Sequence, residues 1–204
     1  MWHVLIGFLR LELLDLKEYH RLVEGFLKER YDVLSKDSSR FKNESPEIYD
    51  EYSTELGLIV HEFPGILRES IFIKGYSIFE YSLDKACSYI ASKNNLNLAL
   101  ADLKDKGIFR SQKYLKKVAE IRFPDHTEEW RRIVIYNEIR NALVHNAGKI
   151  RGQCEKDKAQ KIERLRAIQS IKISQDAIKL MESFIPEVVN DFDSVLNYVE
   201  NNIR

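Results

Sequence analysis

Residues 66–92, ILRESIFIKGYSIFEYSLDKACSYIAS, decide the fold class of this chain. Large apolar side chains recur every three or four positions, and the stretch contains no proline and one glycine. The recurring set is Phe72, Tyr76, Phe79, Leu83, Ala86 and Ile90. This spacing places side chains on one face of an α-helix. The stretch therefore predicts a long helix whose apolar face belongs to the core.

Upstream, the same spacing predicts two more helices. The first is expected from about Trp2 to about Leu34, before a polar loop over residues 35–45. Its stripe contains Leu13, Leu16, Tyr19, Leu22 and Phe26. Pro46 can open a second helix at its first position, and Pro64 is expected to interrupt it.

Downstream, three further helices are predicted. A short one covers about 112–121. Thr127 can cap the next, which starts its apolar periodicity at Trp130 and stops near Gly148, a residue suited to a left-handed terminus. Ser174 is expected to cap the last helix. Its near-heptad stripe contains Ile178, Met181, Ile185, Val188, Phe192, Val195 and Val199.

The chain as a whole reads as helical. It has only eight glycines and four prolines, few β-branched runs and no visible repeat, and strands are hard to place anywhere. The charged segment 149–170 is compatible with a solvated helix or with a mobile loop. We predict an all-α, up-and-down bundle of about five to seven helices. Residues 1–63 are expected to form a helical extension packed on a core bundle of residues 64–204.

Composition excludes several classes of protein. Of the 204 residues, 44% are hydrophobic, which is too many for a disordered chain, and the apolar runs are too short to span a bilayer. Cys87 and Cys154 lack the spacing of a zinc site or a disulfide framework. The first residues lack the basic segment and cleavage site of a signal peptide. We expect a cytoplasmic protein with no metal, no cofactor and no membrane partner.

Charge is neutral in sum but unevenly distributed. The 32 basic and 32 acidic residues leave residues 1–70 at −5, residues 71–173 at +9 and residues 174–204 at −4. A basic middle segment permits binding of a polyanion such as RNA without requiring it, since solvated helix faces have the same composition.

One segment has a pattern with chemical meaning, EIRNALVHNAGK at residues 138–149. The nucleotide-binding loops and common hydrolase motifs are absent from the chain. An Arg followed by a His after four to six intervening residues is expected by chance about once in such a chain. Asn141 directly after Arg140 lowers that expectation about twentyfold, because only 11 of the 204 residues are Asn.

Arg140 and His145 together supply what RNA cleavage by the 2′-hydroxyl needs. A guanidinium holds a phosphate through two parallel hydrogen bonds, and an imidazole transfers protons near neutral pH. Because the nucleophile belongs to the substrate, no metal is required. On a helix Asn141 and His145 share a face, whereas Arg140 lies about 140° around from His145 and about 7.5 Å along the axis. The carbonyl end of a helix favours a cation, which suits His145 as a general acid.

The R-N-x3-H segment, with the Phe79–Glu80 step on an earlier helix, resembles the HEPN superfamily of helical ribonucleases and RNA-binding domains. The resemblance implies a metal-independent endoribonuclease of toxin–antitoxin, abortive-infection or CRISPR-linked defence. It implies a homodimer whose two motifs form one composite cleft, with an antitoxin or sensor as a further partner. By the same resemblance Arg140 and His145 are catalytic, and Asn141 is their supporting polar residue.

The resemblance covers roughly residues 64–204, and residues 1–63 match no family that we recognise. Toxins of this superfamily that pair with a nucleotidyltransferase antitoxin typically have a modified Tyr two positions after the His. This chain has Ala147 there, which argues against silencing by adenylylation at that site.

Each functional residue also has a structural alternative. Arg140 could form a surface ion pair with Glu138 or Asp176, and His145 could cap the end of its helix. Glu80 could orient Arg140 across the bundle or point to solvent. His126 is read as part of an N-terminal cap.

The basic residues Lys149 and Arg151 could contact RNA or belong to a solvated helix face. Single-stranded or loop RNA is the expected substrate, because only unpaired nucleotides present an in-line 2′-hydroxyl. The alternative function is a non-catalytic module of a defence complex that binds RNA or protein.

Overall fold

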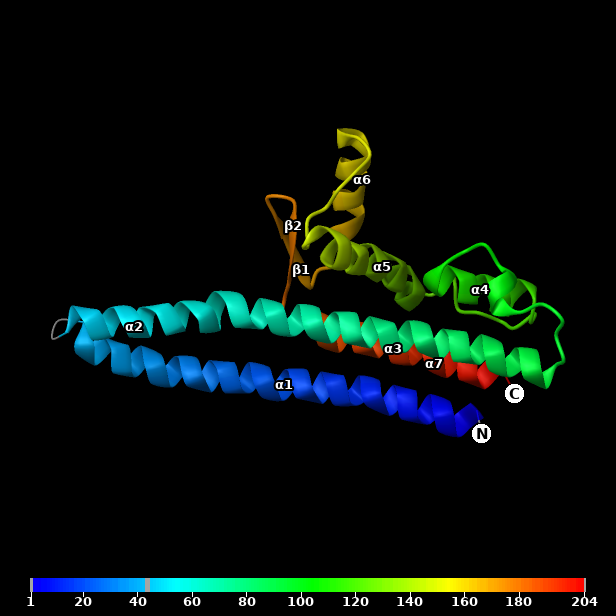
Figure 1. The fold of residues 1–204 in the computed structure, drawn as a ribbon, viewed down its shortest axis with the longest axis horizontal. Coiled ribbons are helices and arrows are strands. Elements are labelled where there is room, and N and C mark those ends of the chain that lie inside the picture. Colours follow the sequence, from blue (N-terminus) through cyan, green and yellow to red (C-terminus); the bar gives the residue numbers. More distant parts are fainter. Residues whose placement is uncertain (1, 43–44, 204) are drawn as a thin grey trace.

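The computed structural model describes residues 2–42 and 45–203, which form a helical bundle (Figure 1). The α-helices are α1 (Trp2–Phe41), α2 (Pro46–Gly57), α3 (Phe63–Lys93), α4 (Gly107–Lys117), α5 (Glu128–Asn146), α6 (Glu155–Leu165) and α7 (Phe184–Asn202). A π-helical turn, η1 (Leu58–Glu62), joins α2 to α3, and a 3-10 turn, η2 (Leu100–Asp102), precedes α4. The strands β1 (Ile171–Ser174) and β2 (Ala177–Leu180) form an antiparallel hairpin. The prediction of an all-α bundle is confirmed.

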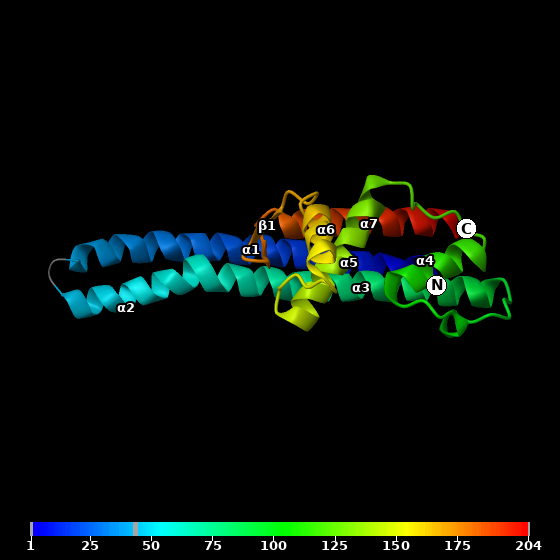
Figure 2. The same cartoon turned by 90° about the horizontal axis from the view of Figure 1, so that it is seen from above.

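The bundle has two sides. α1 runs nearly the length of the molecule, α2, η1 and α3 return along it, and α7 packs beside α1 and α3. α4, α5, α6 and the hairpin lie on the opposite side of α3 and α7 from α1, as Figure 2 shows from a second direction. The motif helix α5 therefore packs mainly on α7 and is remote from α1.

The predicted core helix is confirmed, and its six recurring residues are all buried. Phe79 stacks on Phe192 of α7 with ring centroids 4.3 Å apart, and Phe192 meets Tyr76 and Tyr136 edge-on. The amino-terminal part of α1 joins the same core through Trp2, Ile6, Leu9 and Leu13. Within residues 2–42 and 45–203, no helix is long and apolar enough to cross a membrane.

The first helix is longer than predicted, and its stripe leaves the core. α1 continues to Phe41 through most of the polar stretch 35–45, where a loop was expected; residues 43–44 lie outside the described part of the chain. The Ser39 hydroxyl donates to a carbonyl one turn earlier (2.7 Å), and Phe41 stacks on Tyr52 of α2 (5.8 Å). The ring contact with α2 gives this end of α1 a tertiary support that composition alone does not predict.

Of the five apolar residues predicted to share the core face of the first helix, Leu13 is buried and Leu16 is partly buried, whereas Tyr19, Leu22 and Phe26 are exposed. α3 and α7 approach α1 from the side that carries Ile6, Leu9 and Leu13.

Pro64 does not interrupt the helical path, contrary to the prediction. It lies in the first turn of α3, where a missing N–H costs no helical hydrogen bond. The five residues of η1 link α2 to α3 without a loop.

The segment 171–180 also differs from the prediction. Ser174 ends β1 instead of capping the last helix, which begins at Phe184. Gln175 and Asp176 both have positive φ (50° and 64°), as a two-residue turn between twisted strands requires. Ile178 therefore belongs to a strand with alternating burial. The later stripe residues Ile185, Val188, Phe192, Val195 and Val199 are buried in α7 as expected.

The segments on either side of the motif are partly as predicted. α4 starts five residues earlier than its predicted range of 112–121. The Thr127 hydroxyl accepts from the Trp130 N–H (3.3 Å), which confirms the predicted cap of α5, and Gly148 has the expected positive φ (76°). In the charged segment 149–170, α6 resolves the open choice in favour of a helix.

Candidate functional site

A polar cavity of about 570 Å³ opens where α5 passes over α3 and the start of α4. α5 provides Asn137, Arg140 and Asn141, and α3 provides Glu80. The segment leading into α4 completes the lining with Asp105, Lys106, Gly107 and Phe109. The structure thus brings together three of the predicted residues, Arg140, Asn141 and Glu80.

Arg140 is held in place but retains unused donors. One terminal nitrogen donates to the side-chain oxygen of Asn141 (3.0 Å), and the guanidinium carbon lies 6.0 Å from the ring centre of Tyr76. The Arg140 Nε is buried and has no hydrogen-bond partner among the described residues. A buried N–H without an acceptor is costly, and the second terminal nitrogen, which makes no hydrogen bond with the described residues and is not buried, is the donor open to an incoming anion.

The ion pairs offered as an alternative role for Arg140 are not formed. Glu138 pairs with Arg164 (3.2 Å), and Asp176 pairs with Lys158. Within the described part of the chain, no carboxylate lies within ion-pair distance of Arg140. Arg140 is therefore not neutralised by direct contact.

Tyr76 and Asn137 lie next to Arg140, Tyr76 with its ring near the guanidinium and Asn137 in the lining of the same cavity. Neither role was predicted from the sequence. The Tyr76 hydroxyl donates to the side-chain oxygen of Asn137 (2.9 Å), and burial raises the pKa of Tyr76. Asn137 lies one turn before Asn141 on the same helix face. That spacing of four residues is the signal that could have identified it.

Glu80 faces the cavity that Arg140 lines. Burial raises the pKa of Glu80, and the positive charges of Arg140 and Arg110 oppose this shift only in part. Gly107, with φ of +59°, gives the carboxylate room, because a Cβ at this position would lie 3.3 Å from the Glu80 Oε1. Glu80 thus acts on Arg140 through its electric field across the cavity.

Replacing Glu80 with Gln should stabilise the protein more at high pH than at low pH. A carboxyl whose pKa is higher in the folded state than in the unfolded state provides stability below its unfolded pKa and loses it as the pH rises through the folded pKa. Urea unfolding of wild type and Glu80→Gln at about pH 4 and about pH 8 measures the difference. Exposed Glu12→Gln is the control, and an equal difference at both pH values would contradict the prediction.

His145 lies outside this cavity. It is exposed in the last turn of α5, five residues beyond Arg140. It does not cap the helix, because the backbone N–H groups of Ala147 and Gly148 both donate to the Ala142 carbonyl. His126 is likewise exposed at the opposite end of α5, where Thr127 provides the cap. One chain alone thus does not bring His145 and Arg140 to a common cavity.

Asn141 also borders a second hollow of about 190 Å³, whose lining includes Arg151, Lys161 and Asn146. Lys161 of α6 donates to the Arg151 carbonyl (3.1 Å), which fixes the loop after α5. Lys149 is exposed, and its backbone pairs with Ala177 of the hairpin. The two hollows place cationic side chains on either side of Asn141.

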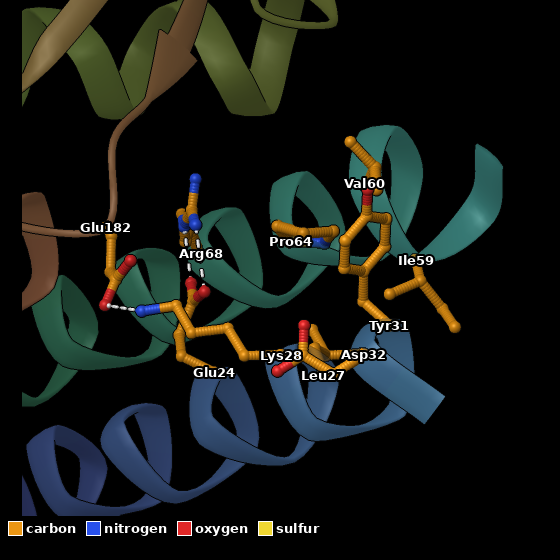
Figure 3. A pocket seen from close by; sticks show the side chains of 10 residues that line it. All are labelled: Glu24, Leu27, Lys28, Tyr31, Asp32, Ile59, Val60, Pro64, Arg68 and Glu182. Carbon is orange, nitrogen blue, oxygen red and sulfur yellow. Dashed lines mark hydrogen bonds and ion pairs between the residues drawn. The ribbon is translucent and has the colours of Figure 1, made fainter. Parts of the chain in front are cut away.

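Another cavity, of about 510 Å³, lies between α1, η1 and the start of α3 (Figure 3). Both of its cations are paired: Arg68 binds Glu24 through two hydrogen bonds (2.6 and 2.9 Å), and Lys28 binds Glu182 (2.6 Å). The described lining of this cavity therefore has no cation without an ion pair, whereas the α5 cavity has Arg140. Among the described residues, no group of three or more His, Cys, Asp or Glu is arranged to hold a metal ion.

Fold and site together define a helical bundle with a polar cavity between α5, α3 and the start of α4, lined by an Arg that has no direct ion pair within the described part of the chain. No family model, curated protein or solved structure matches the chain.

Proposed function

We propose that this protein is a metal-independent endoribonuclease that cleaves single-stranded or loop RNA. One observation carries the proposal: Arg140 lines a polar cavity with Glu80, Asn137 and Asn141, and its buried Nε has no acceptor. The resemblance of the R-N-x3-H segment to the HEPN superfamily supports the same reaction. It also supports a cytoplasmic role in prokaryotic defence or a toxin–antitoxin system, with an antitoxin or sensor as partner.

In this mechanism the scissile phosphate binds Arg140, and Asn141 holds the guanidinium in place. The 2′-oxygen loses its proton and bonds to phosphorus, the bond from phosphorus to the 5′-oxygen breaks, and that oxygen takes up a proton. The products are a 2′,3′-cyclic phosphate and a 5′-hydroxyl. Arg140 stabilises the negative charge that develops on the phosphate.

His145 is the proposed proton donor, and its position favours a dimer. Since His145 and Arg140 project from different sides of α5, a cleft made from two copies is the arrangement in which His145 of one chain reaches the phosphate bound by the other. This composite cleft is also what the family resemblance implies.

Cleavage of an end-labelled single-stranded RNA by the purified protein in excess EDTA tests the proposal. Products with 2′,3′-cyclic phosphate and 5′-hydroxyl ends are expected. Intact RNA that is nevertheless bound in a gel shift would replace the enzyme with the alternative, a non-catalytic RNA-binding module. The separation of His145 from the Arg140 cavity is the observation that favours this alternative. RNA that is neither cut nor bound would refute both.

A further inference from the structure

The outer face of α1 carries a row of exposed apolar side chains. Seven of them are between 51% and 64% exposed: Val4, Phe8, Leu11, Tyr19, Leu22, Phe26 and Val33. Isolated exposed apolar residues are normal on a protein surface, but a continuous row indicates an interaction site. We call these seven residues the α1 stripe.

The α1 stripe follows a regular period of eleven residues. The positions of this period are 4, 8 and 11, then 15, 19 and 22, then 26, 30 and 33, and the seven residues of the α1 stripe occupy all of them except 15 and 30. This repeat corresponds to about 3.67 residues per turn, which keeps a stripe on one side of a nearly straight helix. Only two of the nine positions are polar, Asp15 and Arg30.

No part of the described chain covers the α1 stripe. α1 packs on α3 and α7 through the opposite face, which carries Ile6, Leu9 and Leu13. α4, α5, α6 and the hairpin lie beyond α3 and α7 (Figures 1 and 2). The stripe extends about 45 Å along the helix.

We propose that the α1 stripe binds the same stripe of a second copy, with the two helices antiparallel and crossing near Leu22. In this register the part of the stripe from Leu11 to Val33 pairs with itself, whereas Val4 and Phe8 lie opposite Arg40 and Lys36, beyond the stripe of the other copy. Leu22 meets Leu22, Tyr19 meets Phe26, and Leu11 meets Val33, because the positions in each pair lie at nearly equal distances from the centre. Such an isologous contact closes as a two-fold dimer.

Charge selects this direction. In the antiparallel register Asp15 of each copy lies opposite Arg30 of the other. A parallel pair would instead place Asp15 against Asp15 and Arg30 against Arg30, which is repulsive. Arg30 is exposed, and among the described residues its side chain bonds only the exposed Glu55 of α2 (2.8 Å), so its guanidinium is accessible to a second carboxylate.

Size and net charge support a second copy as the occupant. The five paired apolar side chains of each copy, together with their neighbours on the helix, bury on the order of 1,000 Å², about the lower limit for a specific interface. A helix that binds an anionic membrane surface is typically basic, whereas α1 has seven basic and seven acidic residues. The proposal is independent of the ribonuclease activity, because α5 lies on the other side of the bundle.

Light scattering, which measures the mass in solution, tests the interface when the charges at positions 15 and 30 are reversed singly and together. Wild type should have at least twice the chain mass of 24.0 kDa, and Asp15→Arg should halve the wild-type mass. Adding Arg30→Asp to that variant should restore it. Both positions are exposed, so circular dichroism should be unchanged. A monomeric wild type, or a mass that Asp15→Arg does not alter, overturns the proposal.

Cysteine cross-linking in a Cys154→Ser background tests the direction. Tyr19→Cys combined with Phe26→Cys should form a disulfide-linked dimer, and Phe8→Cys alone should not. Cross-linking of Phe8→Cys would indicate parallel helices and overturn the antiparallel register. Cleavage activity is not a readout here, so these results stand whether or not the protein cuts RNA.

Discussion

Replacing His145 with Ala should lower the rate of RNA cleavage by about 10² to 10⁴, since general acid–base groups contribute about that much. RNA affinity should change little, because the phosphate binds Arg140 and not His145 in the proposed mechanism. Single-turnover cleavage in EDTA measures the rate, and a gel shift measures the affinity. His145 is exposed, so its removal should leave the fold intact.

His126→Ala is the matched control. It removes an exposed His from the other end of α5 and should leave the rate unchanged. Arg140→Ala should lower the rate by about 10² or more, because it removes the charge stabilisation. Arg140→Lys should recover only part of that loss, since an ammonium cannot make the two parallel hydrogen bonds. Equal rates for wild type and His145→Ala would remove His145 from the mechanism.

Phe192→Ala should destabilise the protein by about 3–5 kcal/mol, the usual cost of truncating a fully buried aromatic side chain. Phe192 is 0% exposed and contacts the rings of Phe79, Tyr76 and Tyr136. The resulting cavity lies directly under Tyr76, whose hydroxyl holds Asn137 beside Arg140. Urea unfolding measures the loss of stability.

Phe63→Ala is the control for this substitution, because Phe63 is 43% exposed and should lose less than about 1 kcal/mol. Phe192→Leu keeps most of the buried volume and should cost less than Phe192→Ala. A loss below about 1 kcal/mol for Phe192→Ala would contradict the packing described for α3, α5 and α7.

Helices with a strong apolar period could be predicted from the sequence. The core residues of α3, the Thr127 cap and the later stripe of α7 lie where the spacing placed them, because burial of an apolar face imposes that period. The hairpin could not be predicted in this way. Ile178 fits a helical stripe and a strand equally well. In the structure Gln175 and Asp176 have positive φ and form a turn, which places Ile178 in the second strand of the hairpin.

Part of the candidate site was also predictable. Arg140 and Asn141, which the resemblance grouped together, line one cavity with Glu80, for which the sequence left open whether it faces Arg140 or solvent. Tyr76 and Asn137 were missed as site residues because a Tyr in an apolar stripe is most often only a core residue. Its hydroxyl gains a role only where α3 passes beneath α5.

The sequence by itself determined the helical class, the core faces of α3 and α7 and the motif on α5, because these depend on residues close together in the chain. Only the tertiary structure decided which faces remain open. It left the unpartnered Arg140 Nε in a cavity, placed His145 outside that cavity and left the α1 stripe uncovered. These outcomes depend on which helices pack together, and contacts between distant segments leave no local period in the sequence.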